Sequence, residues 1–477
     1  MTRRSHTLAL QSSSTDRSTL GRRKFFPHLS QSMLLDLLAF GDVAVIVFAS
    51  IFAKYIYLNV LLDTGQPLGR YVVAGFASGL IVFYVLRSRG LHDRTAFADW
   101  RSRWSDLVFY IGLSFLILIA VAYLLKLSAD YSRGWLLTWL VLSLTLVPLG
   151  RLGSGRLLKR LTETGSVVRR VAIVADAARS KQLAARLPRN SGVEVAATFN
   201  VADGDWEAAI AEVIAAGERN AFDEIIIAPS RAGDARGAVD QISALPVHVW
   251  LYLSDLELPI SGTERFAEVN LLKVRSKPIC DWGNASKILF DYVFATILVI
   301  VLAPVMLAIA LAIRLDSPGP VIFRQRRHGF NHVVIDVYKF RTMTVQENGD
   351  HVAQATKNDP RITRVGKLLR QTSLDELPQL FNVLRGQMSL VGPRPHAVAH
   401  NYYYRRQLER YARRHIVKPG ITGLAQINGL RGPTEDPEKM RQRLQFDLNY
   451  IENWSIWMDI KILALTPFRG FINRNAF

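Results

Sequence analysis

The stretch ILFDYVFATILVIVLAPVMLAIALAI, residues 288–313, decides how the second half of the chain meets a membrane. About 20 apolar residues cross a bilayer, so this run is long enough to span it. Both flanks are basic, however, from Lys287 on one side and Arg314 on the other, and both ends therefore favour the cytoplasmic side. Pro304 lies near the middle, where it removes a backbone donor and favours a kink. We expect a broken helix that enters the membrane and returns, with a straight span as the alternative.

Four further apolar runs precede this one. They lie near residues 34–59, 71–87, 106–126 and 135–150, and each approaches the ~20 residues of a membrane span. Lys and Arg gather before the first run, between the second and third, and after the fourth, which places these segments in the cytoplasm. The alternative, four buried helices of a soluble protein, does not explain this charge alternation. We predict a cytoplasmic tail over 1–33 and a four-helix transmembrane domain over 34–152.

The charge balance indicates anionic partners. Lys and Arg number 59 against 40 Asp and Glu, giving a net charge of +19. Nucleic acid, lipid headgroups and phosphorylated substrates all fit such a surplus. The sequence lacks a helix-turn-helix, zinc-finger or aromatic RNA-binding signature, so nucleic acid is not expected. Cys280 is the only cysteine, which excludes an internal disulfide and is compatible with a reducing compartment.

Residues 169–275 alternate between β-rich and helical segments. VRRVAIVA, VEVAATFN, DEIIIAPS and VHVWLYLS are typical of strands, and helical patterns separate them. This order predicts a Rossmann-like α/β domain with a parallel sheet. Its first turn, VADAARS, contains no glycine, so close approach of a pyrophosphate to the backbone is not expected. We predict a scaffold or regulatory role rather than an NAD site.

After residue 314, basic residues recur beside Gly and Pro turns. YKFRTM places two of them at positions two apart, on one face of an extended segment. Guanidinium and ammonium groups held by tight turns suit the gripping of phosphates in a fixed geometry. The residues predicted here to bind substrate phosphate are Arg326, Arg327, Lys339, Arg341, Lys418 and Arg431.

The stretch SLDELPQLFNVLRGQMSLVGPRP, residues 373–395, contains two adjacent carboxylates, Asp375 and Glu376. Ser373 and Glu376 have the spacing of a helix capping box, which is the purely structural interpretation. In the functional interpretation, Asp375 lies in a first helical turn, where the helix dipole favours its ionised, nucleophilic form. Neighbouring helix positions point about 100° apart, so one carboxylate can attack phosphorus while the other holds a metal. Mg²⁺ is commonly held by one or two carboxylates together with substrate phosphates.

From Lys287 onward, several pieces in order resemble the bacterial polyprenyl-phosphate sugar-phosphate transferases (monotopic phosphoglycosyl transferases). These pieces are KILFDYVFA, FRQRRHG, YKFRTM, DPRITRVGKLLRQTSLDELPQLFNVLRGQMSLVGPRP, KPGITGLAQING and DLNYIENWSIWMDIKIL. The four spans and the degenerate nucleotide-binding-like domain resemble the large members of the family. The C-terminal end is similar to the undecaprenyl-phosphate glucose phosphotransferases of exopolysaccharide synthesis. The resemblance implies an integral membrane protein whose residues 284–477 form an α+β catalytic domain with a re-entrant membrane helix over 288–313.

The resemblance also implies site roles. Asp375 matches the nucleophile, which would attack the sugar-proximal phosphate of a UDP-sugar and release UMP before the sugar phosphate passes to undecaprenyl phosphate. Glu376 matches its Mg²⁺-associated partner, with Asp375 as a possible second ligand. Arg370 and Arg394 match basic residues near phosphate, and Pro304 matches the proline that breaks the re-entrant helix. The chain departs from the family pattern at Ala303, His332 and Gln387, none of which touches the carboxylate pair.

The expected partners are a UDP-sugar, undecaprenyl phosphate and membrane lipid, and a homo-oligomer stays open. The expected location is the bacterial inner membrane, with the catalytic domain on the cytoplasmic face. Glucose-1-phosphate is the expected group, with galactose-1-phosphate or another sugar as the alternative. A dehydratase or epimerase in 169–275 would need a glycine-rich turn and a Tyr-x-x-x-Lys motif, which this segment lacks. A non-catalytic scaffold for polysaccharide assembly would leave Asp375 dispensable.

Overall fold

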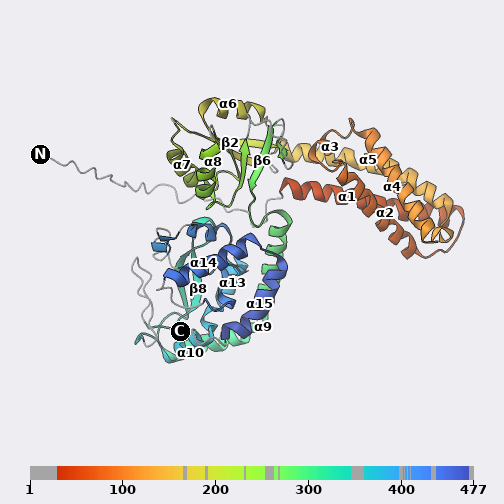
Figure 1. Cartoon of the computed structure of the whole chain (residues 1–477). Helices are drawn as coiled ribbons and strands as arrows, with labels where there is room; N and C mark the ends of the chain where they lie inside the picture. The colour runs from red at the N-terminus through yellow and green to blue at the C-terminus, as the bar shows by residue number, and fades with distance from the viewer. Residues whose placement is uncertain are drawn as a thin grey trace.

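The structure is a computed structural model with three parts. Figure 1 shows an elongated helical bundle, a domain built around a sheet, and an α+β domain that lies against the sheet domain. The described residues are 30–164, 169–187, 192–202, 204–229, 232–252, 263–266, 269–344, 359–396, 401, 403–404, 407–408, 410–430 and 437–471.

The N-terminal bundle contains the four apolar runs predicted from the sequence. Its elements are α1 (Gln31–Lys54), which continues as π-helical turns (η1, Tyr55–Leu61), α2 (Leu68–Ser88), α3 (Arg94–Ala98), α4 (Trp104–Leu124), a short 3₁₀ turn (η2, Ser128–Asp130) and α5 (Arg133–Glu163). Helices α1, α2, α4 and α5 are long and apolar enough to cross a membrane, which confirms the prediction of apolar helices in this region.

The bundle has an apolar core, which includes Trp135 and Trp139, and its outer surface is apolar as well. Gly79 on α2 lets the backbone of α1 approach, since a Cβ there would lie 2.8 Å from Val43 Cγ1. Trp139 on α5 donates from Nε1 to the Ile46 carbonyl oxygen at 3.0 Å. The exposed side chains are largely apolar and include Val73, Phe76, Leu80, Tyr84, Leu116, Leu124 and Val141. An apolar outer surface of this kind suits contact with lipid rather than water.

The middle domain contains the predicted parallel strands. Its elements are β1 (Arg169–Ala175), α6 (Ala177–Arg186), β2 (Val193–Asn200), α7 (Trp206–Glu218), β3 (Glu224–Ala228), α8 (Ala232–Ile242), β4 (His248–Tyr252), β5 (Thr263–Phe266) and β6 (Val269–Arg275). The sheet order is β2-β1-β3-β4-β6-β5, in which the first four strands are parallel and β6 and β5 pair antiparallel. All five residues of β3 are buried, as expected for a parallel strand covered on both faces.

The first turn of this sheet differs from a phosphate-binding turn. The side chain of Asp176 caps α6 and accepts from the backbone N–H of Arg179 at 2.8 Å. A pyrophosphate at this helix start would need the same amide and would meet the Asp176 carboxylate.

The third part is the α+β domain. Its elements are α9 (Asp281–Asp316), β7 (Ile322–His328), the turn η4 (Phe330–His332), β8 (Val334–Phe340), α10 (Arg364–Thr372), the 3₁₀ turn η5 (Leu374–Glu376), α11 (Gln379–Leu384), β9 (Ser389–Val391), η6 (Tyr411–Ile416), β10 (Gly420–Thr422), α13 (Leu424–Ile427), α14 (Pro437–Glu452) and α15 (Ile456–Phe471). β7 and β8 form an antiparallel hairpin, and β9 pairs parallel with β10. One apolar core joins α9, β8, α11, α14 and α15.

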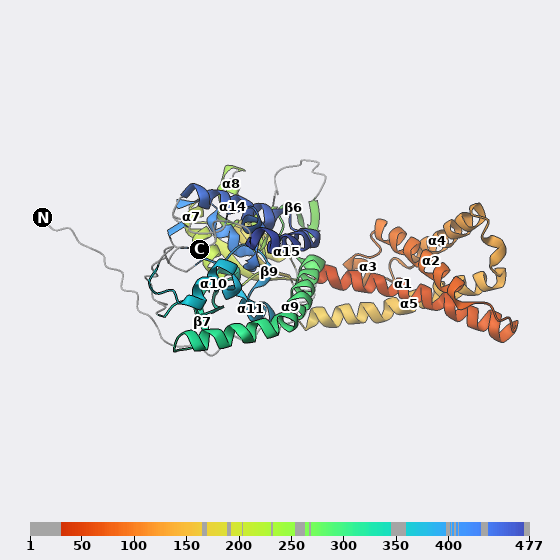
Figure 2. The same cartoon turned by 90° about the horizontal axis from the view of Figure 1, so that it is seen from below.

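Helix α9 carries the predicted run 288–313 and is anchored to this domain at both ends. Near its start, Asp291 accepts from the backbone N–H of Leu390 at 3.0 Å. Near its end, Ile313 packs with Phe340 and Leu369. The helix has 36 residues, and a straight α-helix of that size would be about 54 Å long. Figure 2 shows it bent instead, and Pro304 lies inside it.

The outer face of α9 is strongly apolar. Leu289, Ile300, Leu307 and Leu315 are more than half exposed along its length. One flanking charge differs from expectation, because Lys287 is buried and its Nζ lies 2.7 Å from Asp459. Lys287 therefore fixes α9 to α15 and is not a free charge at the membrane surface.

Candidate active site

The carboxylate pair lies on the single 3₁₀ turn η5, between α10 and α11. Ser373 has φ = 57° and ends α10 in the left-handed region, and its side chain makes no cap hydrogen bond. The predicted capping box is therefore wrong. Thr363 is the N-cap of α10, and α10 continues to Thr372, so no new helix begins at Ser373. A three-residue turn has no appreciable macrodipole, so the dipole cannot account for an ionised Asp375.

Glu376 is clamped by two cations. Its Oε1 accepts from Lys339 Nζ on β8 at 2.9 Å. Arg394 donates to both oxygens, from Nη1 to Oε2 at 2.9 Å and from Nη2 to Oε1 at 2.5 Å. Burial lowers the pKa of Lys339, whereas the Arg394 pKa is raised because Glu376 outweighs the cost of burial. A buried carboxylate with this many charge-assisted bonds fixes both cations in place.

Asp375 has a different environment from its neighbour. Its side chain is partly buried, and among the described residues none donates a hydrogen bond to its carboxylate. Burial raises its pKa, and the Glu376 charge adds to the increase, while Lys339, Arg394 and Arg370 oppose it. Asp375 is thus a carboxylate of raised basicity beside several cations, which suits a nucleophile for an electrophilic phosphorus.

Arg327 belongs to this cluster and Arg326 does not. Arg327 on β7 donates to the Pro395 carbonyl oxygen, and burial together with Arg394 lowers its pKa to about 10. Arg326 is exposed, because successive residues of a strand point to opposite faces. Arg370 on α10 lies near enough to Asp375 to lower its pKa.

Two further predicted phosphate ligands, Arg341 and Lys418, are not brought to the pair. Arg341 follows the end of β8 and donates to the backbone carbonyls of Ser317 and Pro318, so it fastens the segment after α9. Lys418 is half-buried, and burial lowers its pKa, an effect that Asp291 opposes and Lys287 reinforces. Arg431 lies outside the described residues.

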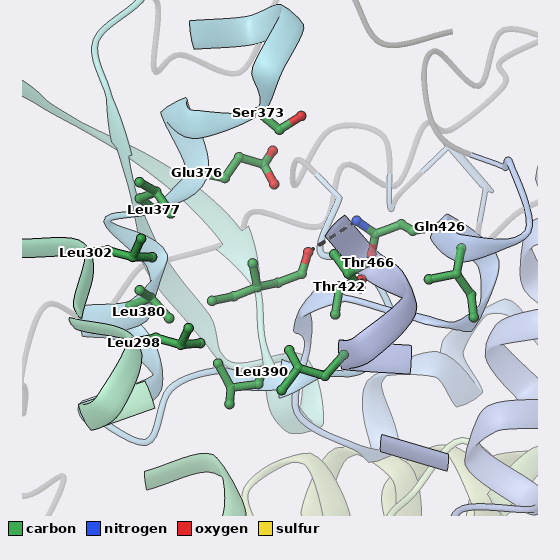
Figure 3. Close-up of a pocket in the computed structure, with 13 residues that line it drawn as sticks. Leu298, Leu302, Ser373, Glu376, Leu377, Leu380, Leu390, Thr422, Gln426 and Thr466 are labelled. Carbon is green, nitrogen blue, oxygen red and sulfur yellow. Dashed lines mark hydrogen bonds between the residues drawn. The ribbon is translucent and has the colours of Figure 1, made fainter. Parts of the chain in front are cut away.

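A cavity of about 180 Å³ adjoins Glu376 and was not predicted from the sequence. Its lining is mostly apolar and comes from α9, η5, α11, β9, β10, α13 and α15. Figure 3 shows Leu298 and Leu302 of α9 on one wall, Glu376 at one end, and Gln426 with Thr466 across from it. The cavity therefore connects Glu376 to the apolar helix α9.

A second group of residues that was not predicted from the sequence contacts the backbone of Arg394. Arg414 donates to the Arg394 carbonyl oxygen at 2.8 Å and to Asp447 at 2.7 Å. His396 is buried against this group, and burial, Arg414 and Arg443 hold its pKa well below the usual range. A neutral His396 adds no charge to a cluster already rich in guanidinium groups. Such contacts join residues distant in sequence, and no local pattern marks them.

The residues fit a magnesium ion only together with substrate. Among the described residues, no group of three or more His, Cys, Asp or Glu side chains is placed to hold a metal. Asp375 and Glu376 supply the oxygen donors that Mg²⁺ prefers, and donor phosphates would complete the set. Because Glu376 is paired with Lys339 and Arg394, it could bind the metal only when these two cations turn toward the donor phosphates.

Comparison with known proteins identifies the family of the chain. The family described as bacterial sugar transferase matches residues 282–473. The UDP-glucose:undecaprenyl-phosphate glucose-1-phosphate transferase of Escherichia coli K12 is 39% identical over 444 residues, 89% of this chain and 91% of that protein. The chain belongs to the bacterial sugar transferase family.

Two further relatives have the same name. The Xanthomonas campestris pv. campestris protein is 36% identical over 80% of this chain and 84% of its own length. The Klebsiella pneumoniae protein is 48% identical over 56% of this chain, and the match spans 58% of its length. A domain described as CoA-binding matches residues 87–251, which include most of the middle domain.

Proposed function

We propose that this sugar transferase moves glucose-1-phosphate from UDP-glucose to undecaprenyl phosphate and releases UMP, as the first membrane step of exopolysaccharide repeat-unit assembly. The observation that carries the proposal is the partly buried Asp375 beside the clamped Glu376, at one end of an apolar cavity walled by α9. The relatives' names supply the sugar and the lipid.

The first step is a displacement at the sugar-proximal phosphorus. An Asp375 oxygen forms a bond to this phosphorus while the bond between the phosphorus and the oxygen that bridges the two phosphates breaks. UMP leaves with that bridging oxygen. Lys339, Arg394 and Arg327 offset the negative charge that collects on the phosphates. Because burial raises the basicity of Asp375, its carboxylate is more nucleophilic than a solvated one once it is ionised.

The second step regenerates the enzyme. A phosphate oxygen of the lipid attacks the same phosphorus, and the bond to Asp375 breaks, which returns a free carboxylate. Splitting the transfer lets a soluble donor and a lipid acceptor use one site in turn. We propose that Glu376 and Asp375, together with the donor phosphates, would hold Mg²⁺, and that the bound ion would supply charge neutralisation at the diphosphate.

The apolar cavity fits the part of the acceptor next to its phosphate. A branched isoprenoid unit is comparable in size to a leucine side chain, and burying such a side chain contributes about 1.5–3 kcal/mol. The walls formed by Leu298, Leu302 and Leu390 offer this burial directly beside Glu376.

We further propose that α9 enters and leaves the membrane on the cytoplasmic side of the bacterial inner membrane. The anchoring of both its ends to one domain, its bend, and its apolar outer face support this arrangement. Freed carbonyls at Pro304 need partners, which a bend packed on protein or near the headgroups supplies. The site would then meet cytosolic UDP-glucose and the lipid phosphate at the same level.

The test is UMP release by the purified full chain with undecaprenyl phosphate and UDP-glucose, compared with UDP-galactose and with UDP-N-acetyl sugars. UDP-glucose should give the highest kcat/KM, and preference for another donor would overturn the choice of sugar. Leu302→Trp, which fills the cavity, should raise the KM for the lipid roughly 10- to 150-fold and leave the KM for the donor unchanged. Leu307→Trp on the outer face of α9 is the matched control. Equal behaviour of the two variants would contradict the cavity's assignment.

A further inference from the structure

The middle domain contacts the catalytic domain at the tip of the β7–β8 hairpin. Asn331 in this tip is 2% exposed. Its Nδ2 donates to the carbonyl oxygens of Gly217 and Glu218, each at 3.1 Å, and lies 3.2 Å from Asn220 Oδ1. Gly217 and Glu218 end α7, so Asn331 donates to the carbonyls of a helix C-terminus, where the Gly217 carbonyl also accepts from the Asn220 N–H at 2.9 Å.

The backbone at this tip is built for the contact. Asn331 has φ = 49° and the next residue, His332, has φ = 59°, so both occupy the left-handed region. Asn is one of the few residues other than glycine that adopts this region readily. An asparagine here therefore supplies both the sharp turn and a side-chain donor. Another contact between the domains, Arg410 with Asp240 at 3.8 Å, is exposed on both sides and contributes little.

The same hairpin carries two cations of the active site. Lys339 lies on β8 and Arg327 on β7, on strands paired from Ile322–Phe340 to His328–Val334. A two-stranded hairpin is at best marginally stable alone. Within the catalytic domain, Asn382 on α11 holds the middle of β8, since its Oδ1 accepts from the Tyr338 N–H and its Nδ2 donates to the Asp336 carbonyl oxygen. At the far end, His328 and His332 pack against His415 of the catalytic domain, and Asn331 binds the middle domain.

We infer that the middle domain acts as a support for catalysis, and that Asn331 is a positioning residue which sets Lys339 and Arg327 through the β7–β8 hairpin. Such a support is a task for the sheet domain that needs no bound nucleotide. Only the expected kinetic effect rests on the proposed function, because the contact between Asn331 and the middle domain is independent of the reaction.

The test compares Asn331→Gly with the wild type as the full chain in lipid nanodiscs. Glycine keeps the left-handed backbone and removes only the side chain. Hydrogen exchange of amides in 322–340 and at the end of α7 should become about three- to tenfold faster, as expected for the loss of hydrogen bonds. The kcat/KM for UDP-glucose should fall by a similar factor, while the KM for the lipid stays unchanged. Asp63→Gly, at an exposed left-handed residue in the loop before α2, is the matched control and should alter neither readout.

A double variant separates positioning from general loosening. In a Lys339→Met, Arg327→Met background, Asn331→Gly should still speed hydrogen exchange in the hairpin but should cost no further kcat/KM. Unchanged exchange in Asn331→Gly would overturn the docking, and a full additional kinetic loss in that background would overturn positioning through these two cations. If the wild type released no UMP with any donor, the proposed function would fail while the exchange result still decided the docking.

Discussion

Replacement of Lys339 by methionine tests the electrostatic part of the mechanism. Lys339 is 15% exposed, and its ammonium group lies 2.9 Å from a Glu376 oxygen. Methionine keeps the apolar length of the side chain and removes the charge. Arg394 remains on both Glu376 oxygens, so Glu376 is not left unpaired.

The magnitude follows from these contacts. A hydrogen bond between charged groups contributes about 1.5–3 kcal/mol. A loss of about 2 kcal/mol from the transition state lowers kcat/KM about 30-fold. Burial lowers the pKa of Lys339, so keeping this side chain charged costs folding free energy. Removing the charge also removes that cost, and the melting temperature should therefore change little. Lys339 also lowers the pKa of Asp375, so its removal should move the acid limb of the rate profile to higher pH.

The assay is steady-state UMP release over a range of pH, with Lys439→Met on the exposed face of α14 as the matched control. The control should retain wild-type kcat/KM. A Lys339→Met enzyme with normal kcat/KM would refute the role of this charge. If kcat/KM fell because the variant's melting temperature had dropped strongly, and the pH profile were unchanged, the electrostatic role of Lys339 would be refuted.

Three further outcomes are expected. Exhaustive EDTA treatment should abolish UMP release and Mg²⁺ should restore it, whereas full activity without metal would contradict a magnesium requirement. In a Cys280→Ala background, Ser286→Cys and Val333→Cys should both resist an impermeant thiol reagent added outside spheroplasts, and labelling of only the second site would mean that α9 spans. The raised pKa of Asp375 means that ionisation of its carboxylate costs folding stability as pH rises through that pKa, so Asp375→Asn should melt at a higher temperature than the wild type at pH 8; a lower melting temperature at that pH would contradict the direction of the shift.

The parts of the fold that could be predicted from sequence are those with local patterns. The four N-terminal helices follow from continuous apolar runs, and β1 to β4 follow from short β-branched segments between helical ones. Strands β5 and β6 were not predicted, because their antiparallel pairing adds an edge to a sheet whose other strands are parallel.

The site residues that could be predicted from sequence are those that lie close together in one segment. Asp375, Glu376 and Arg394 lie within one stretch, and the structure places them together with Lys339. Ser373 was misassigned because α10 extends to Thr372 and leaves no room for a new cap. Arg341 was assigned from its charge and its spacing to Lys339, and Lys287 from its charge. In the structure, Arg341 donates to the Ser317 carbonyl oxygen and Lys287 pairs with Asp459. Such partners come from distant segments that charge patterns cannot identify.

The central claim is that Asp375 carries the sugar phosphate between donor and lipid. The most direct measurement is mass spectrometry of the full chain quenched after mixing with UDP-glucose and Mg²⁺ in the absence of undecaprenyl phosphate. The account predicts a hexose-phosphate adduct on the peptide that contains Asp375, formed together with one equivalent of UMP and discharged when the lipid is added. Asp375→Asn should show neither adduct nor UMP. An adduct on another residue, or UMP release by Asp375→Asn near the wild-type rate, would contradict covalent catalysis at this carboxylate.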